Sequence, residues 1–303
     1  MDKIGVIGLG NIAQKAYLPV MASLQDKYEW HLTTRNEEKG QKLASKCGFK
    51  HLHQTLDQLI DEKPLAVFVH TPTSTHESVI RQLLNAGINV YVDKPISENL
   101  AVVKNLYKLA DEKNLMLTCG FNRRFAPFNQ KLKEVTNKRL ITSEKIRENS
   151  PQPVKFAIFD LMIHSVDTAL YLIDEPIENV VNHLVTNGDN LEQGYVTLIS
   201  KNEEVQVTTN LVGGMNLERS TVQGLTGRAE VTNLNILTEF KTGSSTQTLR
   251  PDWERNLITR GFEPLILKFL DAVSNTKKNP ISPESSILSH KICTDLLKSQ
   301  SLD

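Results

Sequence analysis

The sequence predicts an α/β chain with two domains. Residues 1–120 are expected to form a doubly wound parallel sheet, and residues 121–303 an α+β domain with a large, mainly antiparallel open sheet. Strand and helix patterns alternate up to Cys119, which is typical of parallel βαβ units with right-handed crossovers. After Gly120, apolar and polar residues alternate in short runs between turn sequences. The length of 303 residues also fits two domains, at roughly 150 residues each.

Each element of the first domain follows from its hydrophobic pattern. Leu65–Val69 is almost continuously apolar, as in a strand that is buried on both faces. Glu37–Cys47 places alanine and leucine on one helical face, and Gly87 ends a helix that begins at Thr75. The expected strands are Lys3–Ile7, Glu29–Thr33, Leu65–Val69, Ile88–Val92 and Leu115–Cys119. The expected helices are Ile12–Leu24, Glu37–Cys47, Leu56–Ile60, Thr75–Ala86 and Leu100–Lys113.

In the second domain, alternation indicates strands with one buried face and one face free to meet solvent or another subunit. Asn202–Glu204 and Thr226–Arg228 have the composition of hairpin turns. The expected strands are Ile141–Arg147, Tyr195–Ile199, Val205–Leu211, Ser220–Gln223 and Ala229–Thr232. The expected helices are Pro127–Val135, Ile158–Leu172, Phe262–Ser274 and Glu284–Gln300.

Composition excludes several classes of partner. The chain has 35 basic and 35 acidic residues, so its charge gives no electrostatic support for a nucleic-acid partner. No apolar stretch approaches the roughly 20 residues that a membrane helix needs. The first strand begins almost at the N-terminus, which leaves no room for a signal peptide. Cys47, Cys119 and Cys293 are scattered, as expected of free thiols in a reducing compartment. We therefore expect a cytoplasmic protein.

A glycine turn follows the first strand directly. Gly8 would permit the tight turn from strand to helix, and Gly10 would remove a side chain where the backbone approaches a phosphate. Ala13 is small enough to replace the third glycine of this motif. A dinucleotide pyrophosphate would then bind the free N–H groups of a helix that starts near Asn11 and Ile12. The alternative is an ordinary glycine-rich turn before a helix.

The end of the second strand bears on which cofactor binds. An acidic residue commonly stands there and hydrogen-bonds the ribose 2′-hydroxyl. This strand instead continues into Thr34, Arg35 and Asn36, whose side chains can donate hydrogen bonds and add positive charge for a 2′-phosphate. We therefore expect NADP(H) to be preferred over NAD(H). The alternative is that Arg35 stacks on the adenine and both cofactors bind.

The segment His70–His76 follows a strand at the carboxyl edge of the expected sheet. Ligands of open α/β sheets bind at that edge. Small hydroxylated residues suit a loop that crosses a ribose or nicotinamide, so Thr71, Pro72 and His76 are candidate cofactor ligands. A capped helix start explains His76 equally well.

Lys94 follows the next strand at the same edge, within Asp93-Lys94-Pro95. A lysine amine in a cofactor crevice can stabilise negative charge that develops on a substrate oxygen and favour the neutral form of a nearby base. Pro95 restricts Lys94 to extended backbone, which would help to fix the direction of its side chain. The alternative is a solvated surface lysine.

Asp160, His164 and Asp167 form a polar stripe if their segment is helical. Asp160 precedes His164 by four residues, and Asp167 follows it by three. The positions between them are largely apolar, and buried ionisable groups are costly unless they are paired or used. Histidine is suited to carrying a proton near neutral pH. The alternative is a hydrogen-bonded core histidine flanked by two aspartates. No other cluster has metal-ligand spacing, so no metal site is expected.

The motifs occur in an order that resembles the glucose–fructose oxidoreductase/inositol dehydrogenase/MocA (Gfo/Idh/MocA) family. They are Gly-x-Gly-x-x-Ala, Thr71-Pro72 with His76, Asp93-Lys94-Pro95, Gly120–Phe125, and Asp160 with His164 and Asp167. The resemblance spans essentially the full chain. It is closest to the MviM-type branch, on the evidence of Gly120–Pro127 and Arg260-Gly261-Phe262.

The resemblance implies a function and a set of site residues. Family members have a Rossmann domain and transfer a hydride between a nicotinamide cofactor and a sugar, sugar-derivative or cyclitol carbon. It implies that Lys94, Asp160 and His164 are catalytic and that they bind substrate together with Asn122 and Arg124. It also implies a homodimer or homotetramer formed through the open sheet.

One departure from the family pattern leaves a second function open. Many members have glycines before and within the helix of the catalytic histidine, whereas Val154–Phe159 and Leu161-Met162 are bulky here. The alternative function is therefore a catalytically silent nucleotide-binding sensor or regulatory protein. Retention of Lys94, Asp160 and His164 together favours the enzyme.

Overall fold

The computed structural model describes residues 1–299, which form two compact units. The first unit contains Met1–Gly120 and Phe262–Ile287, and the second contains Phe121–Gly261 and residues 288–299. The boundary after Gly120 coincides with the expected one, but the sequence analysis placed Phe262–Ile287 in the second domain. This segment packs in the first unit because the ring of Phe269 lies 5.3 Å from Phe68 and 5.4 Å from Tyr91, centroid to centroid.

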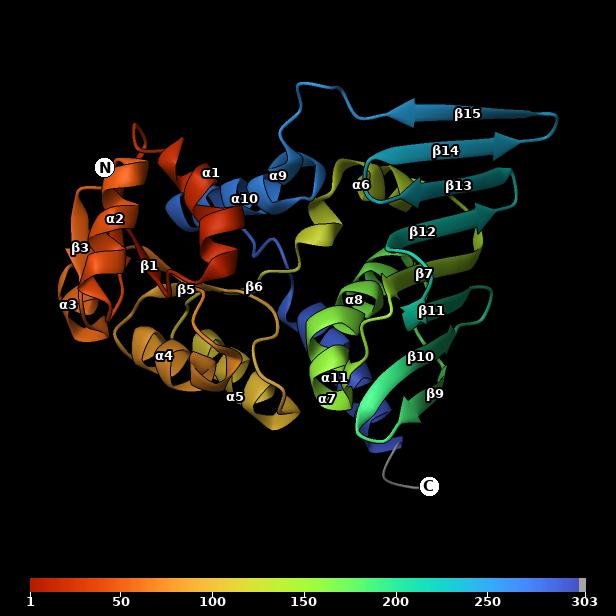
Figure 1. Cartoon of the computed structure of the whole chain (residues 1–303), viewed down its shortest axis with the longest axis horizontal. Helices are drawn as coiled ribbons and strands as arrows, with labels where there is room; N and C mark the ends of the chain where they lie inside the picture. Colours follow the sequence, from red (N-terminus) through yellow and green to blue (C-terminus); the bar gives the residue numbers. More distant parts are fainter. Residues whose placement is uncertain (300–303) are drawn as a thin grey trace. The chain divides into compact units, whose positions relative to one another are not determined.

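The first unit contains a six-stranded parallel sheet with the order β3-β2-β1-β4-β5-β6 (Figure 1). Its strands are β1 (Asp2–Ile7), β2 (Tyr28–Thr33), β3 (His51–His53), β4 (Ala66–Val69), β5 (Asn89–Val92) and β6 (Leu117–Cys119). This is the order of a doubly wound sheet, in which the chain reverses its direction of winding at β1 and β4. The predicted fold class is confirmed.

Helices cover both faces of this sheet (Figure 1). They are α1 (Leu18–Ala22), preceded by a π-helical turn at Ala13–Tyr17, α2 (Glu37–Cys47), α3 (Leu56–Asp61), α4 (Thr73–Asn85), α5 (Leu100–Glu112) and α10 (Phe262–Ser274). On one face, Tyr17 and Phe269 pack on Phe68. On the other, α3 approaches so closely that a Cβ added at Gly5 would lie 2.9 Å from Leu59. This glycine is therefore required by packing.

The strand β3 was not among the expected elements. It has only three residues, His51-Leu52-His53, and two of them are polar, so its sequence has no apolar run. Its pairing with β2 defines it: His31 lies opposite His51, and Thr33 opposite His53. Two histidines are thereby brought to the edge of the sheet next to a third.

The second unit contains a nine-stranded sheet in which β7 and β11 are parallel and the other pairs are antiparallel (Figure 1). Its strands are β7 (Lys138–Glu148), β8 (Gln152–Pro153), β9 (Asn179–Asn187), β10 (Asn190–Ile199), β11 (Glu204–Gly213), β12 (Leu217–Gly224), β13 (Gly227–Thr232), β14 (Ile236–Lys241) and β15 (Ser244–Leu249). The strands β8, β9, β14 and β15 were not among the expected elements. Every residue of β15 is exposed, so this edge strand has no apolar face to detect.

One face of this sheet is covered by helices and the other is open. The remaining helices are α6 (Pro127–Lys133), α7 (Val154–Ala157), α8 (Ile163–Leu172), the single turn α9 (Asn256–Thr259) and α11 (Pro283–Ser299). Along β11, Val205, Val207 and Leu211 are buried, whereas Gln206 is exposed. The predicted alternation is thus present. The expected helix Glu284–Gln300 corresponds to α11, and Gln300 lies outside the described residues.

The bulky segment before His164 packs in the core of the second unit. Phe159 and Met162 are at most 1% exposed, and Val154 is 5% exposed. The opposing strand makes room for them, because a Cβ at Gly194 would lie 2.8 Å from the Met162 sulfur. Lys155 and Phe156 are exposed, Phe156 with half of its surface.

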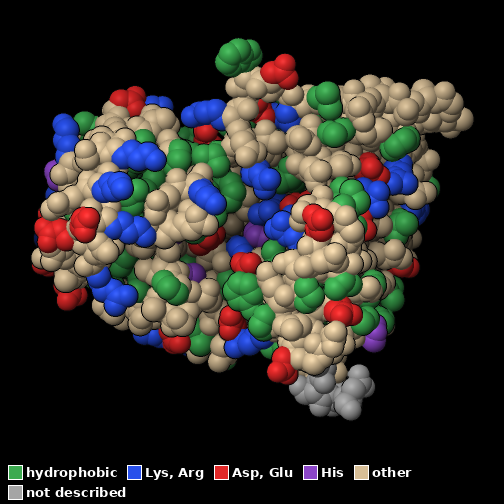
Figure 2. All heavy atoms as spheres, in the orientation of Figure 1, with side chains coloured by type: hydrophobic (Ala, Val, Ile, Leu, Met, Phe, Trp, Pro, Cys, Tyr) green, Lys and Arg blue, Asp and Glu red, His purple; other side chains and the backbone are tan. Residues whose placement is uncertain are grey.

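Within residues 1–299, no helix is both long and apolar enough to cross a membrane. The face of the molecule in Figure 2 carries basic and acidic side chains that are interspersed. This mixture agrees with the formal net charge of zero.

Candidate active site

The glycine turn after β1 has the geometry that the motif predicts. Gly8 has a φ of +91°, and a Cβ there would lie 2.5 Å from the backbone of His70 and Thr71. Only glycine fits this position, because the loop after β4 crosses directly beside it. A Cβ at Gly10 would meet nothing within 4 Å. The fold itself therefore does not require glycine at Gly10, and the open space beside it fits the close approach of a phosphate.

The helix after this turn begins at Asn11 and carries a π-helical turn at Ala13–Tyr17. Asn11 and Ile12 are exposed, whereas Ala13 is fully buried, so the small third residue of the motif serves helix packing. The first N–H groups of a helix have no intrahelical partner and favour an anion. This end of the helix can therefore bind a pyrophosphate.

The segment after β2 presents hydrogen-bond donors and no carboxylate until α2 begins. Asn36 caps α2, since its Oδ1 accepts from the backbone N–H of Lys39 at 2.9 Å. Arg35 is exposed and makes no ion pair with the part of the chain that the structure describes. Thr34 is half-buried, and its Oγ1 accepts from the backbone N–H of Asn36 at 3.4 Å. The Asn36 cap is a structural role that the sequence analysis did not assign.

The loop between β4 and α4 is held by His76. Its Nδ1 lies 2.9 Å from the carbonyl oxygen of Pro95, and its Nε2 lies 2.8 Å from that of Thr71. The ring is 2% exposed and connects the loop after β4 to the loop after β5. His76 therefore holds these two loops together, while Thr71 and Pro72 belong to the loop after β4.

His70 is a buried histidine whose ring nitrogens have no hydrogen-bond partner among residues 1–299. Its ring packs on Tyr17 with centroids 3.9 Å apart. Burial lowers the pKa of His70 to about 3, and the nearby His76 contributes in the same direction. The ring is neutral at pH 7.

Lys94 follows a buried network of hydroxyl and carboxyl groups. The Tyr17 hydroxyl lies 3.2 Å from that of Tyr91 and 3.2 Å from Asp93 Oδ1, which also accepts from the Lys94 backbone N–H at 3.0 Å. Burial raises the pKa of Asp93, although the charge of Lys94 opposes this. The Lys94–Pro95 peptide bond is cis. The network fixes the backbone from which the Lys94 side chain projects.

In the second unit, His164 lies beside a buried guanidinium. Arg123 Nη1 is 3.3 Å from both ring nitrogens of His164. Its guanidinium also binds Glu218 with two hydrogen bonds, at 3.0 and 3.3 Å, and Lys145 donates to the same carboxylate. Because a guanidinium can only donate, a hydrogen bond to His164 requires an unprotonated ring nitrogen. This is the form that a general base needs.

Glu218 is the common partner of two cations. Burial alone would raise its pKa, but the charges and hydrogen bonds of Arg123 and Lys145 outweigh burial and hold the pKa of Glu218 well below its usual range. For Lys145, burial lowers the pKa and Glu218 partly restores it. The carboxylate is therefore ionised at neutral pH.

Two predicted substrate ligands already have protein partners. Arg124 binds Asp167 with two hydrogen bonds, at 2.9 and 2.5 Å, and Ser289 donates to the same carboxylate at 2.7 Å. Asn122 donates from Nδ2 to the carbonyl oxygen of Arg260 at 2.7 Å. Both Arg124 and Asn122 are less than 9% exposed. The expected stripe is thus divided, because Asp167 pairs with Arg124 in the interior.

Asp160 and His164 lie on one continuous helical segment, but not on a regular α-helix. Asp160 is within a π-helical turn, Ile158–Met162, and His164 is the second residue of the α-helix that follows, α8. Both side chains are half-buried. Single π-turns inside helices are frequent at functional sites.

Four residues of these networks were not among the predicted site residues: Tyr17, Arg123, Lys145 and Glu218. Arg123 stands inside the Gly120–Phe125 motif, so the motif marked its position but not its role. Lys145 and Glu218 lie on paired strands, where Lys145 is directly opposite Glu218. Cross-strand pairing of opposite charges would have identified them if the register had been known.

The fold and the glycine turn define the class of protein. A parallel sheet in this order, with a Gly-x-Gly-x-x-Ala turn after β1, is a nucleotide-binding Rossmann domain. Residues 3–121 match the family model GFO_IDH_MocA, described as an oxidoreductase family with an NAD-binding Rossmann fold.

Relatives extend this match over the whole chain. YceM of Salmonella typhimurium, an oxidoreductase by name, is 32% identical over 96% of this chain and 95% of its own. The crystal structure of the dehydrogenase MviM from Clostridium difficile is 33% identical, with a TM-score of 0.93 over 98% of this chain and 99% of that one. The myo-inositol 2-dehydrogenase of Thermotoga maritima is 29% identical over 59% of this chain and 57% of its own. The chain belongs to the Gfo/Idh/MocA family of oxidoreductases, and the predicted similarity to MviM is confirmed.

Proposed function

We propose that this oxidoreductase transfers a hydride between NADP(H) and a hydroxyl-bearing or keto carbon of a sugar, sugar derivative or cyclitol. The observation that carries the proposal is the open space beside Gly10. This space lies at the glycine turn, where Gly8 packs closely against the loop after β4. The substrate class rests on the family and on the relative that is named myo-inositol 2-dehydrogenase.

The residues around the glycine turn fit a dinucleotide. The backbone N–H groups near Asn11, Ile12 and Ala13 would hold the pyrophosphate, and a side chain at Gly10 would fill the space that the phosphate needs. Gly10→Ala is the test. We expect the thermal stability to be unchanged and the cofactor affinity to fall at least tenfold, which is about 1.4 kcal/mol. Unchanged affinity would argue against a phosphate at this turn.

We assign the preference for NADP(H) to Thr34, Arg35 and Asn36. Arg35 is exposed and has no ion-pair partner among the described residues, so its charge is available to a 2′-phosphate. Arg35→Ala should weaken NADP(H) by about 1.5–3 kcal/mol, which is typical of a hydrogen bond to a charged group, and leave NAD(H) nearly unchanged. Lys42→Ala, which removes an exposed charge from α2, is the matched control. Equal or tighter binding of NAD(H) by the unmodified protein would contradict the preference.

We assign the proton transfer to His164. In the oxidative direction, His164 takes the substrate hydroxyl proton, and Lys94 stabilises the negative charge that develops on the same oxygen. Asp160 orients substrate hydroxyls. The nicotinamide, when bound, accepts or supplies the hydride. Arg123 Nη1, 3.3 Å from both ring nitrogens, would help to hold the His164 ring in position.

The deciding experiment follows reduced-nicotinamide absorbance with sugar phosphates, cyclitols and sugar acids as substrates. Turnover by the unmodified protein is expected, and His164→Ala or Lys94→Ala should lower it by at least 10²-fold while cofactor binding persists. Tight cofactor binding without any response to substrate would favour the silent sensor. The bulky segment that suggested a sensor packs in the core of its unit, so it does not favour that alternative.

We also propose that the open sheet of the second unit is the subunit interface of a cytoplasmic homodimer or homotetramer. Its uncovered face carries a large aromatic residue, Tyr195, which is 39% exposed. Sedimentation of the purified protein tests this, and a monomer at micromolar concentration would contradict it.

A further inference from the structure

A cluster of imidazoles and carboxylates lies at the edge of the parallel sheet. Glu29 and His31 are two residues apart on β2, so their side chains leave the same face of the sheet. His51 lies directly opposite His31 on the edge strand β3. His53 follows on the same face, and Glu62 caps the C-terminal end of α3. Five potential metal ligands therefore meet at one place.

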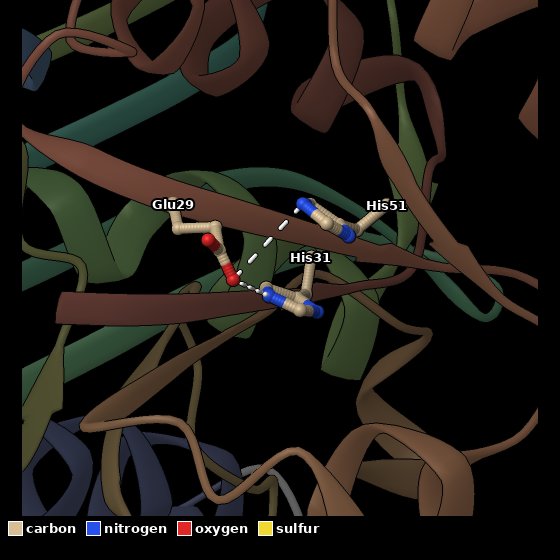
Figure 3. A group of neighbouring side chains, drawn as sticks. All are labelled: Glu29, His31 and His51. Carbon is tan, nitrogen blue, oxygen red and sulfur yellow. Dashed lines mark hydrogen bonds and ion pairs between the residues drawn. The ribbon is translucent and has the colours of Figure 1, made fainter. Parts of the chain in front are cut away.

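The cluster contains two triads that share His31. In the first, ligand atoms of Glu29, His31 and His51 all lie within 4.8 Å of one another (Figure 3). In the second, the same limit holds for His31, His53 and Glu62. The triads use opposite nitrogens of His31, because Nε2 faces Glu29 at 2.8 Å and Nδ1 faces His53 at 2.9 Å.

The first triad is the better metal site. Glu62 is already neutralised by Lys3, whose Nζ lies 2.6 Å from it, so a cation there would compete with an ammonium group. Glu29 has no lysine or arginine partner within hydrogen-bond distance among residues 1–299, and its Oε1 lies 4.0 Å from His51 Nε2. Figure 3 shows the rings of His31 and His51, each joined by a dashed line to the Glu29 carboxylate.

We propose that Glu29, His31 and His51 bind one divalent transition-metal ion, with Zn²⁺ as the reference ion. Two imidazole nitrogens and one carboxylate oxygen are a common ligand set for zinc, whereas Mg²⁺ and Ca²⁺ prefer oxygen ligands alone. Ligands about 2.0–2.1 Å from a tetrahedral ion are roughly 3.3 Å apart. The Glu29–His31 distance of 2.8 Å and the Glu29–His51 distance of 4.0 Å lie on either side of that value. Small side-chain rotations would equalise them.

Burial supports a site that is anchored on one side and open on the other. The His31 side chain is 1% exposed, so its position is fixed by the sheet. Glu29 and His51 are 37% and 42% exposed, which leaves a path for the ion and a position for water. The stacking of the His31 and His51 rings, with centroids 4.4 Å apart and planes at 13°, holds both imidazoles side by side.

The site would connect β2 to the short edge strand β3. The carbonyl oxygen of His53 accepts a hydrogen bond from the backbone N–H of Thr34. Thr34 belongs to the segment proposed to bind the 2′-phosphate, so β3 is bonded directly to that segment. A bound ion is therefore expected to stabilise the first unit against thermal unfolding, because a ligand that binds only the folded state adds to its stability.

Zn²⁺ competition with a chromophoric chelator tests the proposal on tag-free protein. One equivalent of Zn²⁺ is expected to bind. His51→Ala or Glu29→Gln should lower the Zn²⁺ affinity at least tenfold, because loss of even an outer-shell partner lowers metal affinity about 10–100-fold. The matched controls are His183→Ala, an exposed histidine of the second unit, and Glu62→Gln, which belongs to the other triad. Both controls should bind as the unmodified protein does.

Co²⁺ provides a second measurement, because its visible absorption depends on the ligands and geometry. The spectrum of a tetrahedral nitrogen–oxygen site is expected for the unmodified protein and should be lost in both His51→Ala and Glu29→Gln. Circular dichroism shows whether each variant is folded. Absence of Zn²⁺ binding, or binding that neither variant weakens, would overturn the proposal. If Glu62→Gln alone abolished binding, the second triad would be the site and the assignment made here would be wrong.

Discussion

Replacing Glu218 with glutamine should destabilise the second unit strongly. Its carboxylate is 15% exposed and accepts from Arg123 and Lys145, whose side chains are 11% and 10% exposed. Glu218→Gln keeps the shape of the side chain but leaves two mostly buried cations without their anion. Removing one partner of a buried ion pair typically costs about 3–5 kcal/mol.

The distances in this network agree with a cost of that size. The Arg123–Glu218 pair at 3.0 Å has a Coulomb energy of about 5–6 kcal/mol at an effective dielectric constant of about 20, before the cost of desolvation is subtracted. Glu144→Gln is the control, because Glu144 pairs with Arg219 on the neighbouring strand but is 26% exposed, with its partner 42% exposed. An exposed pair contributes less than about 1 kcal/mol.

Urea unfolding followed by far-UV circular dichroism measures both variants. Because the folded-state pKa of Glu218 lies below its unfolded-state value, its stabilisation is complete above about pH 4.5 and is lost as the pH falls through the folded-state pKa. The difference between Glu218→Gln and the unmodified protein should therefore shrink in acid. If Glu218→Gln at pH 7 cost no more than Glu144→Gln, the network would not be a stabilising feature of this unit.

Three further substitutions test other parts of the structure. Between pH 7 and 4.5, the unmodified protein should lose about 2.5 kcal/mol more stability than His70→Phe does. The reason is that the unfolded histidine binds a proton below about pH 6.5, whereas the buried ring does so only near pH 3. Parallel pH profiles of the two proteins in urea melts would refute this. Asp167→Asn should cost about 3–5 kcal/mol because it removes the carboxylate charge that pairs with the buried Arg124, and an unchanged melting temperature would contradict that. Gly194→Ala should cost about 1–3 kcal/mol by pressing on Met162, and combining it with Met162→Ala should remove that part of the cost.

Local pattern was sufficient for most of the fold. The parallel sheet, α2 and α10 were predictable because apolar runs and helical periodicity are properties of neighbouring residues. By contrast, β3 and β15 are polar and gain their strand conformation from pairing with a neighbour. Their identification required the tertiary structure.

The functional residues divide in the same way. Gly8 and Gly10 were predictable because a turn motif has a fixed spacing, and their different structural roles agree with it. The partner of Arg124 was not predictable from the sequence, because Asp167 is 43 residues away in the chain. The Glu29–His31–His51 cluster was not predictable for the same reason: His51 joins the others only through the register of a strand that the sequence does not reveal.

A crystal structure of the NADP⁺ complex with a bound sugar or cyclitol tests the central claim most directly. We expect the pyrophosphate at Gly10, and both the Lys94 amine and a His164 ring nitrogen within about 2.6–3.2 Å of one substrate oxygen. A dinucleotide bound away from the glycine turn, or an amine and an imidazole that contact different ligands, would contradict the proposed enzyme.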